Sequence, residues 1–287
     1  MRILLWNVPE NHYISMSKRF FRTIVPLAVA IAATACSGHS KLLKSQDREL
    51  MYQKALEYHE ARKYEKSSDL IAEIEYYYMG TVREDTILYI KADNAYQQQD
   101  YFTSSMIFDD FRRRFGRSPF AEEAEYKYAM GFYYLSPPPN RDQTLTYQAI
   151  TAMTEYMERY PDNVRKQLCL VRIDELQNQL YDKSLLNAKT YVKIGRYKSA
   201  VVALKNALAE YPATPHREEI LYLTTKSSYE LASNSVRAIQ RDRYMDMMDT
   251  YYTFISEFPD SRYRKEVDRM HKTARSFLDT HPTDVIE

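Results

Sequence analysis

The sequence predicts an all-α protein, a superhelix of about five helix pairs closed by one further helix. Only 5 of its 287 residues are Gly, 27 are Tyr, and continuous β-rich runs are missing. A short motif, an aromatic residue followed by a helix breaker, recurs at Phe115-Gly116, Tyr160-Pro161, Tyr211-Pro212 and Phe258-Pro259. Its three prolines are separated by 51 and 47 residues. A regular period of this kind indicates stacked helical repeats.

Each copy of the motif is expected to end one helix and begin the next. Proline cannot donate the backbone hydrogen bond that a continuing helix needs. Asn163, Thr214 and Ser261, each two residues after a proline, can cap the following helix by accepting from its free N–H groups. Pro119 and Pro215 then fall in a first helical turn, where proline is tolerated.

The N-terminal segment has the parts of a signal peptide, in the order of a basic cluster, an apolar run and small residues. The basic cluster lies within residues 18–22, the apolar run within 24–33, and the segment ends at Cys36. The run is shorter than the roughly 20 apolar residues of a membrane span. We therefore expect a lipoprotein signal peptide at residues 16–35, lipidation of Cys36 after cleavage, and a lipidated tether at residues 36–46.

Two details of the leader leave alternatives open. Ala33 stands where the commonest lipoprotein motif has Leu, so ordinary signal cleavage near Ala35 is the competing interpretation. Counting from Met16 gives a leader of 21 residues through Cys36. Residues 1–15 are then an upstream mis-start or an extension of the leader.

The same repeat frame divides the rest of the chain. We expect N-terminal repeats one and two at 47–118, repeat three at 119–162, repeats four and five with a capping helix at 163–280, and a tail at 281–287. Spacings above the usual repeat length of about 34 residues imply long helices, notably one over 163–194. The last helix, 261–278, carries charges on one side, as the end of a repeat stack requires.

Repeat four has the sharpest pattern, counted back from Pro212. At 24, 21, 17, 15, 12, 8 and 5 residues before that proline stand Ala188, Tyr191, Gly195, Tyr197, Ala200, Leu204 and Ala207. This spacing resembles the tetratricopeptide repeat position for position. The three alanines are small where two antiparallel helices approach closely, Tyr191 and Leu204 are expected to be knobs on the same faces, and Gly195 supplies the turn.

The sequence has no arrangement of residues that indicates a catalytic or cofactor site. The six histidines are scattered, and none has a two-His spacing on a helix that would favour a metal site. There is no Gly-rich phosphate loop and no recognisable nucleophile motif. Cys169 lies in an apolar stretch that favours a buried, inert thiol. The sequence therefore predicts a protein that is not an enzyme and has no cofactor.

The charge balance argues against a nucleic-acid partner. The whole chain has 40 Lys+Arg and 39 Asp+Glu, and without residues 1–35 the formal net charge is −2. The one dense basic cluster, Arg112 to Arg114 with Arg117, falls at the end of an expected helix. There it suits the negative end of the helix dipole.

Tyr76, Tyr77 and Tyr78 form a run that cannot place every ring on one face of a helix. Most tyrosines of the chain have helical spacing and are expected in the core, but at least one of these three should reach the surface. A surface tyrosine can bind an extended peptide by ring stacking and by a hydroxyl hydrogen bond. The run is therefore a candidate peptide-binding site.

This chain resembles the BamD family of outer-membrane lipoproteins over nearly all of residues 36–280. The resemblance rests on the lipidation motif, the chain length, the five repeats and the long helix before repeat four. The resemblance implies a scaffold of the β-barrel assembly machinery, lipid-anchored at the periplasmic face of the outer membrane. Its implied partners are the barrel-forming assembly subunit, bound by the C-terminal repeats, other assembly lipoproteins, and unfolded outer-membrane proteins received near the N-terminal repeats. The family is also expected to carry an Arg for the partner contact on the second helix of repeat four, where this chain has Ala203.

Two other classes of envelope protein use such repeats. A periplasmic tetratricopeptide-repeat adaptor for cell-wall or division proteins is the alternative, and Cys36 discriminates because such adaptors usually lack lipid. A glycan-capturing lipoprotein typically needs a chain about twice as long with a large inserted domain.

Overall fold

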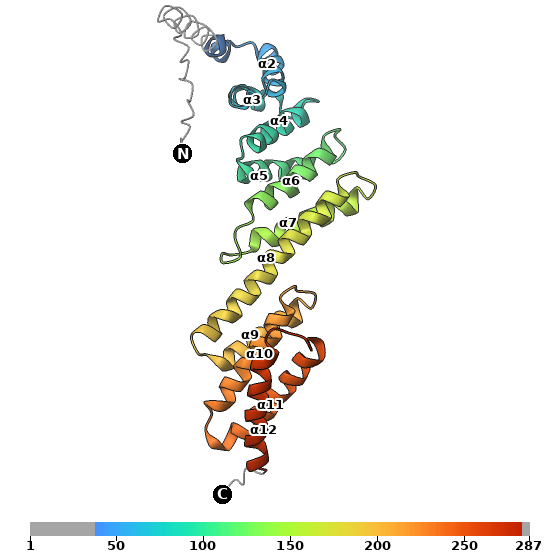
Figure 1. The fold of residues 1–287 in the computed structure, drawn as a ribbon. Coiled ribbons are helices and arrows are strands. Elements are labelled where there is room, and N and C mark those ends of the chain that lie inside the picture. The colour runs from blue at the N-terminus through green and yellow to red at the C-terminus, as the bar shows by residue number, and fades with distance from the viewer. Residues whose placement is uncertain (1–37, 283–287) are drawn as a thin grey trace, which may run out of the picture. The chain divides into compact units, whose positions relative to one another are not determined.

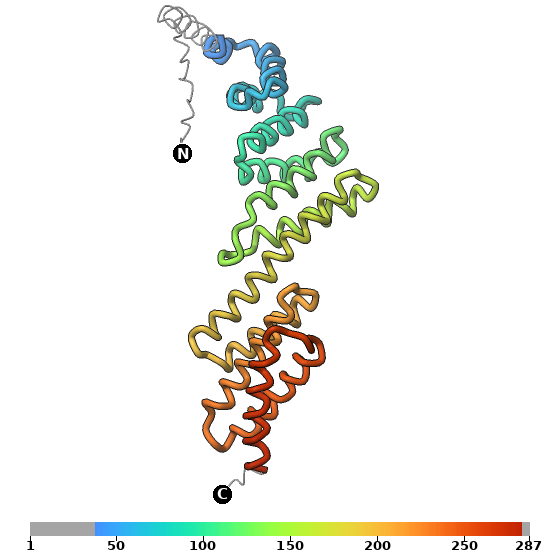
Figure 2. Tube along the Cα trace, in the orientation of Figure 1, coloured from blue at the N-terminus to red at the C-terminus, as the bar shows by residue number. Residues whose placement is uncertain are grey.

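The computed structural model describes residues 38–282, so Cys36, the expected signal peptide and residues 283–287 of the expected tail lie outside the described part. Within it, the secondary structure consists of helices and turns and contains no strand. The predicted all-α fold is confirmed. Figure 1 and Figure 2 follow the helices from α2 to α12 along the chain.

The chain divides into two compact units between Gln99 and Asp100. This division falls inside the block 47–118 that the sequence assigns to two N-terminal repeats. Helix α5 (Tyr101–Arg114) packs extensively against α6 (Ala121–Leu135) and belongs to the second unit. The period of the repeats gives no information on which neighbouring helices pack most closely.

The first unit is built on an antiparallel hairpin of α2 (Arg48–Glu60) and α3 (Tyr64–Tyr78), with α4 (Glu84–Gln97) packed on α3. Ala55 of α2 and Leu70 and Ile74 of α3 are fully buried. A buried polar chain links the helices, because Ser67 Oγ donates to Ala55 O at 2.8 Å and receives a hydrogen bond from Asn94 Nδ2 at 2.9 Å.

The second unit continues as consecutive antiparallel helices that pack on their neighbours in chain order. After α5 and α6 come α7 (Thr144–Arg159), α8 (Lys166–Lys193), α9 (Tyr197–Glu210), α10 (Arg217–Ser233), α11 (Arg237–Glu257) and α12 (Arg264–Thr280). Helix α8 has 28 residues, and its two ends pack with different partners, α7 and α9. It appears as the long yellow helix of Figure 1. The predicted long helix before repeat four is present.

The polar residue that follows each recurring motif forms a turn before the helix instead of capping the helix itself. Asn163, Thr214 and Ser261 each accept from the backbone N–H two residues later, at 2.8, 3.2 and 3.1 Å. Ser118 Oγ likewise accepts from the backbone N–H of Phe120 at 3.3 Å. The backbone then closes a turn to the third residue, where the helix begins. Helices therefore start about three residues later than predicted, and Pro119 and Pro215 sit in the turns, one residue after Ser118 and Thr214.

Gly195 ends α8 in the left-handed conformation, with a φ of +71°. The N–H of Arg196 bonds to Tyr191 O at 2.9 Å, and the N–H of Gly195 bonds to Val192 O at 3.1 Å. These are the two hydrogen bonds of a Schellman motif, which favours glycine at the left-handed position. The turn between α8 and α9 thus depends on Gly195.

The last helix, α12, covers the end of the second unit. Val267, Met270 and Ala274 are its buried residues and recur at three- and four-residue spacing. Its partners are α11 and α10. It begins three residues after the predicted residue 261, because the backbone closes a turn from Ser261 to Arg264, and it ends two residues after the predicted residue 278.

Candidate protein-docking surfaces

Most of the small and apolar residues predicted for repeat four lie between its two helices. Ala188, Ala200 and Leu204 have no exposed surface, and Ala207 is almost completely buried. Tyr197 is half-buried and Pro212 is exposed in the turn after α9.

Tyr191 is the exception, because 41% of its surface is exposed. Its predicted role as a buried knob is wrong. Three residues along a helix change direction by about 60°, since a turn takes 3.6 residues. The buried side of α8, which includes Leu185 and Ala188, continues instead through Val192, four residues after Ala188, so Tyr191 lies at the edge of that stripe.

The Tyr191 ring instead lines a surface hollow of about 370 Å³ between α8 and α9, which we call the repeat-four hollow. Its other lining residues are Lys198, Ser199, Val202, Ala203 and Asn206. Val202 is 54% exposed within it. Ala203 stands where the family resemblance places an Arg, so this position offers an apolar surface and not a charge.

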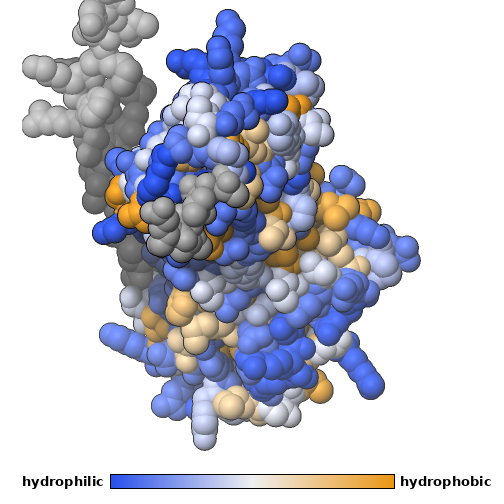
Figure 3. Space-filling model, turned by 90° about the horizontal axis from the view of Figure 1, so that it is seen from below, coloured by the Kyte–Doolittle hydropathy of each residue, from blue (hydrophilic) through white to orange (hydrophobic). Residues whose placement is uncertain are grey.

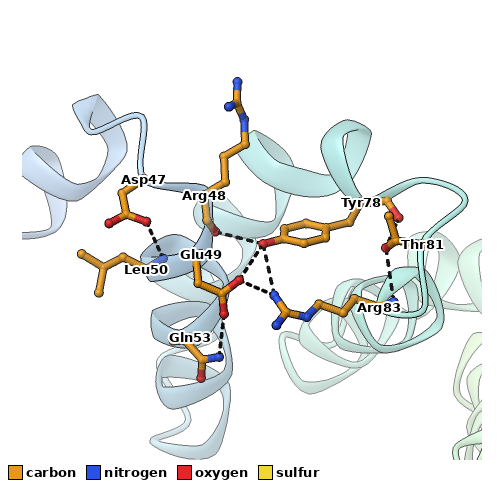
Figure 4. Close-up of polar contacts among 8 residues, drawn as sticks. All are labelled: Asp47, Arg48, Glu49, Leu50, Gln53, Tyr78, Thr81 and Arg83. Atoms are coloured by element: carbon orange, nitrogen blue, oxygen red, sulfur yellow. Dashed lines mark hydrogen bonds and ion pairs between the residues drawn. The ribbon is translucent and has the colours of Figure 1, made fainter.

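Tyr78 closes the end of the α2–α3 hairpin and is only 6% exposed (Figure 4). Its hydroxyl donates to Glu49 Oε2 at 3.3 Å and accepts from Arg83 Nη1 at 3.3 Å. Arg83 also pairs with Glu49, and its guanidinium lies 4.5 Å from the centre of the Tyr52 ring. Burial raises the pKa of Tyr78. The inclusion of Tyr78 in a peptide-binding site is therefore wrong, because the ring belongs to the core.

Tyr76 and Tyr77 do reach the surface, with 87% and 57% of their area exposed. Arg48 lies 4.7 Å above the Tyr77 ring. Met79 and Val82 follow in the loop to α4 and are 56% and 95% exposed. We call Tyr76, Tyr77, Met79 and Val82 the hairpin-end patch.

The loop that carries Met79 and Val82 of this patch is held by hydrogen bonds. Thr81 Oγ1 donates to Tyr78 O at 2.7 Å, and the N–H of Gly80 donates to Glu84 Oε2 at 2.7 Å. Gly80 has a φ of +74°, which glycine adopts without strain. The apolar side chains are thus displayed on a defined turn, which reduces the entropy that a partner must remove on binding.

The arginines at the end of α5 pair with acidic neighbours. Arg112 bonds to Asp109 and Glu155, both at 3.0 Å. Arg113 pairs with Asp109, and Arg114 pairs with Asp110 at 2.9 Å.

Cys169 is 1% exposed, and burial raises the pKa of its thiol. Over residues 38–282, no group of three His, Cys, Asp or Glu side chains is placed to hold a metal ion.

Exposed apolar residues elsewhere are distributed in small groups. In the view of Figure 3 the surface is mainly hydrophilic, and hydrophobic residues form separate patches. No helix in the described part of the chain is long and apolar enough to cross a membrane. Val202, Met79 and Val82 were not among the predicted site residues. For Met79 and Val82 a signal was available, because both are apolar residues in the short segment between two expected helices.

Antiparallel helix pairs in consecutive contact, closed by a polar capping helix, define a helical-repeat protein with separate exposed apolar patches. A family model described as "Outer membrane lipoprotein", YfiO, matches residues 44–243 and 188–287. The chain belongs to this family.

Two curated relatives support the BamD-type resemblance. The "Outer membrane protein assembly factor BamD" of Caulobacter vibrioides is 22% identical over 216 residues, covering 74% of this chain and 71% of the relative. A "Putative outer membrane protein assembly factor BamD" of Aquifex aeolicus is 23% identical over 257 residues, covering 88% and 83%. Among solved structures, a TPR-repeat protein from Bacteroides fragilis is 11% identical and covers 81% of this chain and 100% of its own, with a TM-score of 0.38.

Proposed function

We propose that this protein is a non-catalytic lipoprotein scaffold that helps to assemble β-barrel proteins in the outer membrane. The observation that carries the proposal is the family match, which runs through both units from residue 44 to residue 287. The leader that ends at Cys36 supports a lipid anchor, with the two units on the periplasmic face. Ser37 and Gly38 follow the cysteine, without the Asp that commonly retains lipoproteins in the inner membrane.

In this proposal the second unit binds the barrel-forming assembly subunit, alone or with other assembly lipoproteins. Repeat scaffolds bind partners through extended surfaces made by successive helix pairs. The repeat-four hollow is the docking surface we favour, because Tyr191 and Val202 give it an exposed apolar wall beside the polar Lys198 and Asn206. Apolar and aromatic anchors of this kind contribute most to protein interfaces.

A single substitution tests this assignment. Val202→Glu places a charge on the exposed wall of the hollow, and we expect the barrel-forming subunit to be lost from the purified complex. Met106→Glu is the matched control, because Met106 is a similarly exposed apolar residue on α5, 62% exposed. Equal loss with both variants, or with neither, would contradict docking at this hollow.

The hairpin-end patch is the proposed contact for unfolded outer-membrane proteins. Tyr76 and Tyr77 offer ring faces and hydroxyls to an extended chain. Replacing both by Ala should weaken binding of a peptide taken from a barrel strand, measured by fluorescence anisotropy. Tyr252→Ala, at a tyrosine 48% exposed on α11, is the control. Unchanged peptide affinity in the double variant would contradict binding of unfolded proteins at the hairpin-end patch.

A further inference from the structure

Two short helical faces converge at the N-terminal edge of the first unit. Residues 38–44 are helical, and Gly38, Lys41, Leu42 and Ser45 recur along one side of this segment at three- and four-residue spacing. Opposite them lie Leu50, Lys54 and Tyr58, spaced by four along α2. Together these seven residues line an open hollow of about 430 Å³, which we call the anchor-side hollow.

The segment that forms one wall is fixed in place. His39 Nε2 lies 3.0 Å from Asp69 Oδ2, and the His39 ring meets the edge of the Tyr58 ring at 5.6 Å between centres. Leu42 is only 9% exposed. The hollow is therefore a feature of the packed unit.

Covalent geometry puts this hollow beside the expected anchor. Cys36 precedes Gly38 by two residues, and consecutive Cα atoms are about 3.8 Å apart, so the two Cα atoms are within about 8 Å. If Cys36 carries lipid, as the proposed function requires, the leaflet that takes up its acyl chains begins next to the wall of the hollow.

The lining has the chemistry of a lipid headgroup site. Leu42, Leu50 and the Tyr58 ring supply apolar surface, and Lys41 and Lys54 supply positive charge at the rim. Two more lysines, Lys63 and Lys66, place their Nζ atoms 5.9 Å from the centre of the Tyr58 ring.

The acidic groups nearby leave this rim basic. Glu57 pairs with Lys54 at 2.5 Å, and Asp69 is engaged by His39. Two lysines that line the hollow and two near its Tyr58 ring thus outnumber these two carboxylates. Lysine ammonium groups bind phosphate as point charges, and clusters of them attract anionic lipid surfaces.

We propose that the anchor-side hollow holds the phosphate and the upper acyl chain of a phospholipid from the leaflet that receives Cys36. The site would give the first unit a second, noncovalent membrane contact. The diacylglycerol carried by the cysteine itself has no phosphate to match the lysines, so a separate phospholipid fits the rim better. This inference rests on the proposed lipid anchor.

The sequence offers a clean reporter. The chain has one Trp, Trp6, which precedes Cys36 and is absent after cleavage at that residue. Tyr58→Trp places a unique indole in the hollow and keeps an aromatic ring there. Val164→Trp is the matched control, because Val164 is 93% exposed in the turn before α8 and lines none of the proposed sites.

The lipidated variants are reconstituted in vesicles of phosphatidylglycerol and phosphatidylcholine brominated on its acyl chains. We expect the Tyr58→Trp emission to shift to the blue and to be strongly quenched, while Val164→Trp emits as in water. Adding Lys41→Glu and Lys54→Glu should restore the emission of Tyr58→Trp, whereas Lys265→Glu with Lys272→Glu, at exposed positions of α12, should not.

Flotation of the same samples distinguishes failure of the lipid anchor from failure of the phospholipid site. Protein that fails to float has no working anchor, which overturns the proposed attachment and this site with it. Protein that floats with Tyr58→Trp unquenched, or quenched regardless of the lysine reversals, overturns the phospholipid site alone. A spectral shift only on addition of an unfolded peptide would assign the hollow to peptide and likewise overturn it.

Discussion

Small side chains set the closest helix contacts of the second unit. Ala200 has no exposed surface between α8 and α9. Ala200→Leu adds three carbons to this contact, and overpacking of a core typically costs about 1–3 kcal/mol of unfolding free energy. We expect a lower melting temperature by calorimetry. Lys198→Leu, two residues away on the exposed side, is the control, and equal melting of the two variants would contradict the packing described.

Gly131 and Ser105 form a second close contact, between α6 and α5. A Cβ atom added at Gly131 would collide with Ser105 Oγ but would lie 3.5 Å from Ser105 Cβ. Ser105 Oγ is buried without a hydrogen-bond partner among the described residues. The obstacle is therefore a single oxygen atom.

The expected result is a change of sign in a double-mutant cycle. Gly131→Ala alone should destabilise the protein. In a Ser105→Ala background it should stabilise it, because Ala is favoured over Gly within a helix by about 0.5–1 kcal/mol. Urea denaturation of the four proteins measures this. Destabilisation by Gly131→Ala in both backgrounds would mean that the oxygen is not the obstacle.

At the scale of the element, an ion pair joins the start of α10 to the end of α11. Arg217 Nε and Nη2 donate to the two oxygens of Glu257 at 2.5 and 2.8 Å. These hydrogen bonds lower the pKa of Glu257. Since the folded pKa lies below the unfolded value of about 4.3, the pair stabilises the fold above that pH and loses its effect as pH falls through the folded pKa.

We expect Glu257→Gln to cost about 0.2–1 kcal/mol near neutral pH, since both partners are about one-third exposed. The difference from the natural protein should disappear as the pH falls well below 4.3. Thermal unfolding between pH 7 and pH 3 checks this. A difference that grows on acidification would have the wrong sign for this pair.

The sequence predicted the helical repeats well because proline and the polar residue after it act locally on the backbone. It placed helix starts about three residues early, since Asn163 or Ser261 can equally cap a helix or close a turn. Tyr191 and Tyr78 were misassigned because periodicity gives the spacing of a face but not what covers it. The Glu49–Arg83 pair joins residues 34 apart, and no local signal reveals it.

At the scale of the whole molecule, the proposed lipid anchor at Cys36 would decide where both units act. Cys36→Ser should release the protein from the outer membrane or leave the precursor uncleaved, because each buried methylene contributes about 0.8 kcal/mol and several acyl chains are needed for stable attachment. Membrane fractionation with immunoblotting shows both outcomes. A variant of mature size that stays in the outer membrane, even after its partners are stripped by urea, would contradict lipidation of Cys36.

The proposed scaffold role is tested most directly by what the lipidated protein binds in its own membrane. The measurement is affinity purification from solubilised outer membrane, with Val202→Glu in parallel and quantitative mass spectrometry of the bound proteins. The barrel-forming assembly subunit should be the most enriched protein with the natural chain and should be lost with the variant. Enrichment of cell-wall or division enzymes, with no barrel protein in either sample, would contradict the account and favour a periplasmic adaptor.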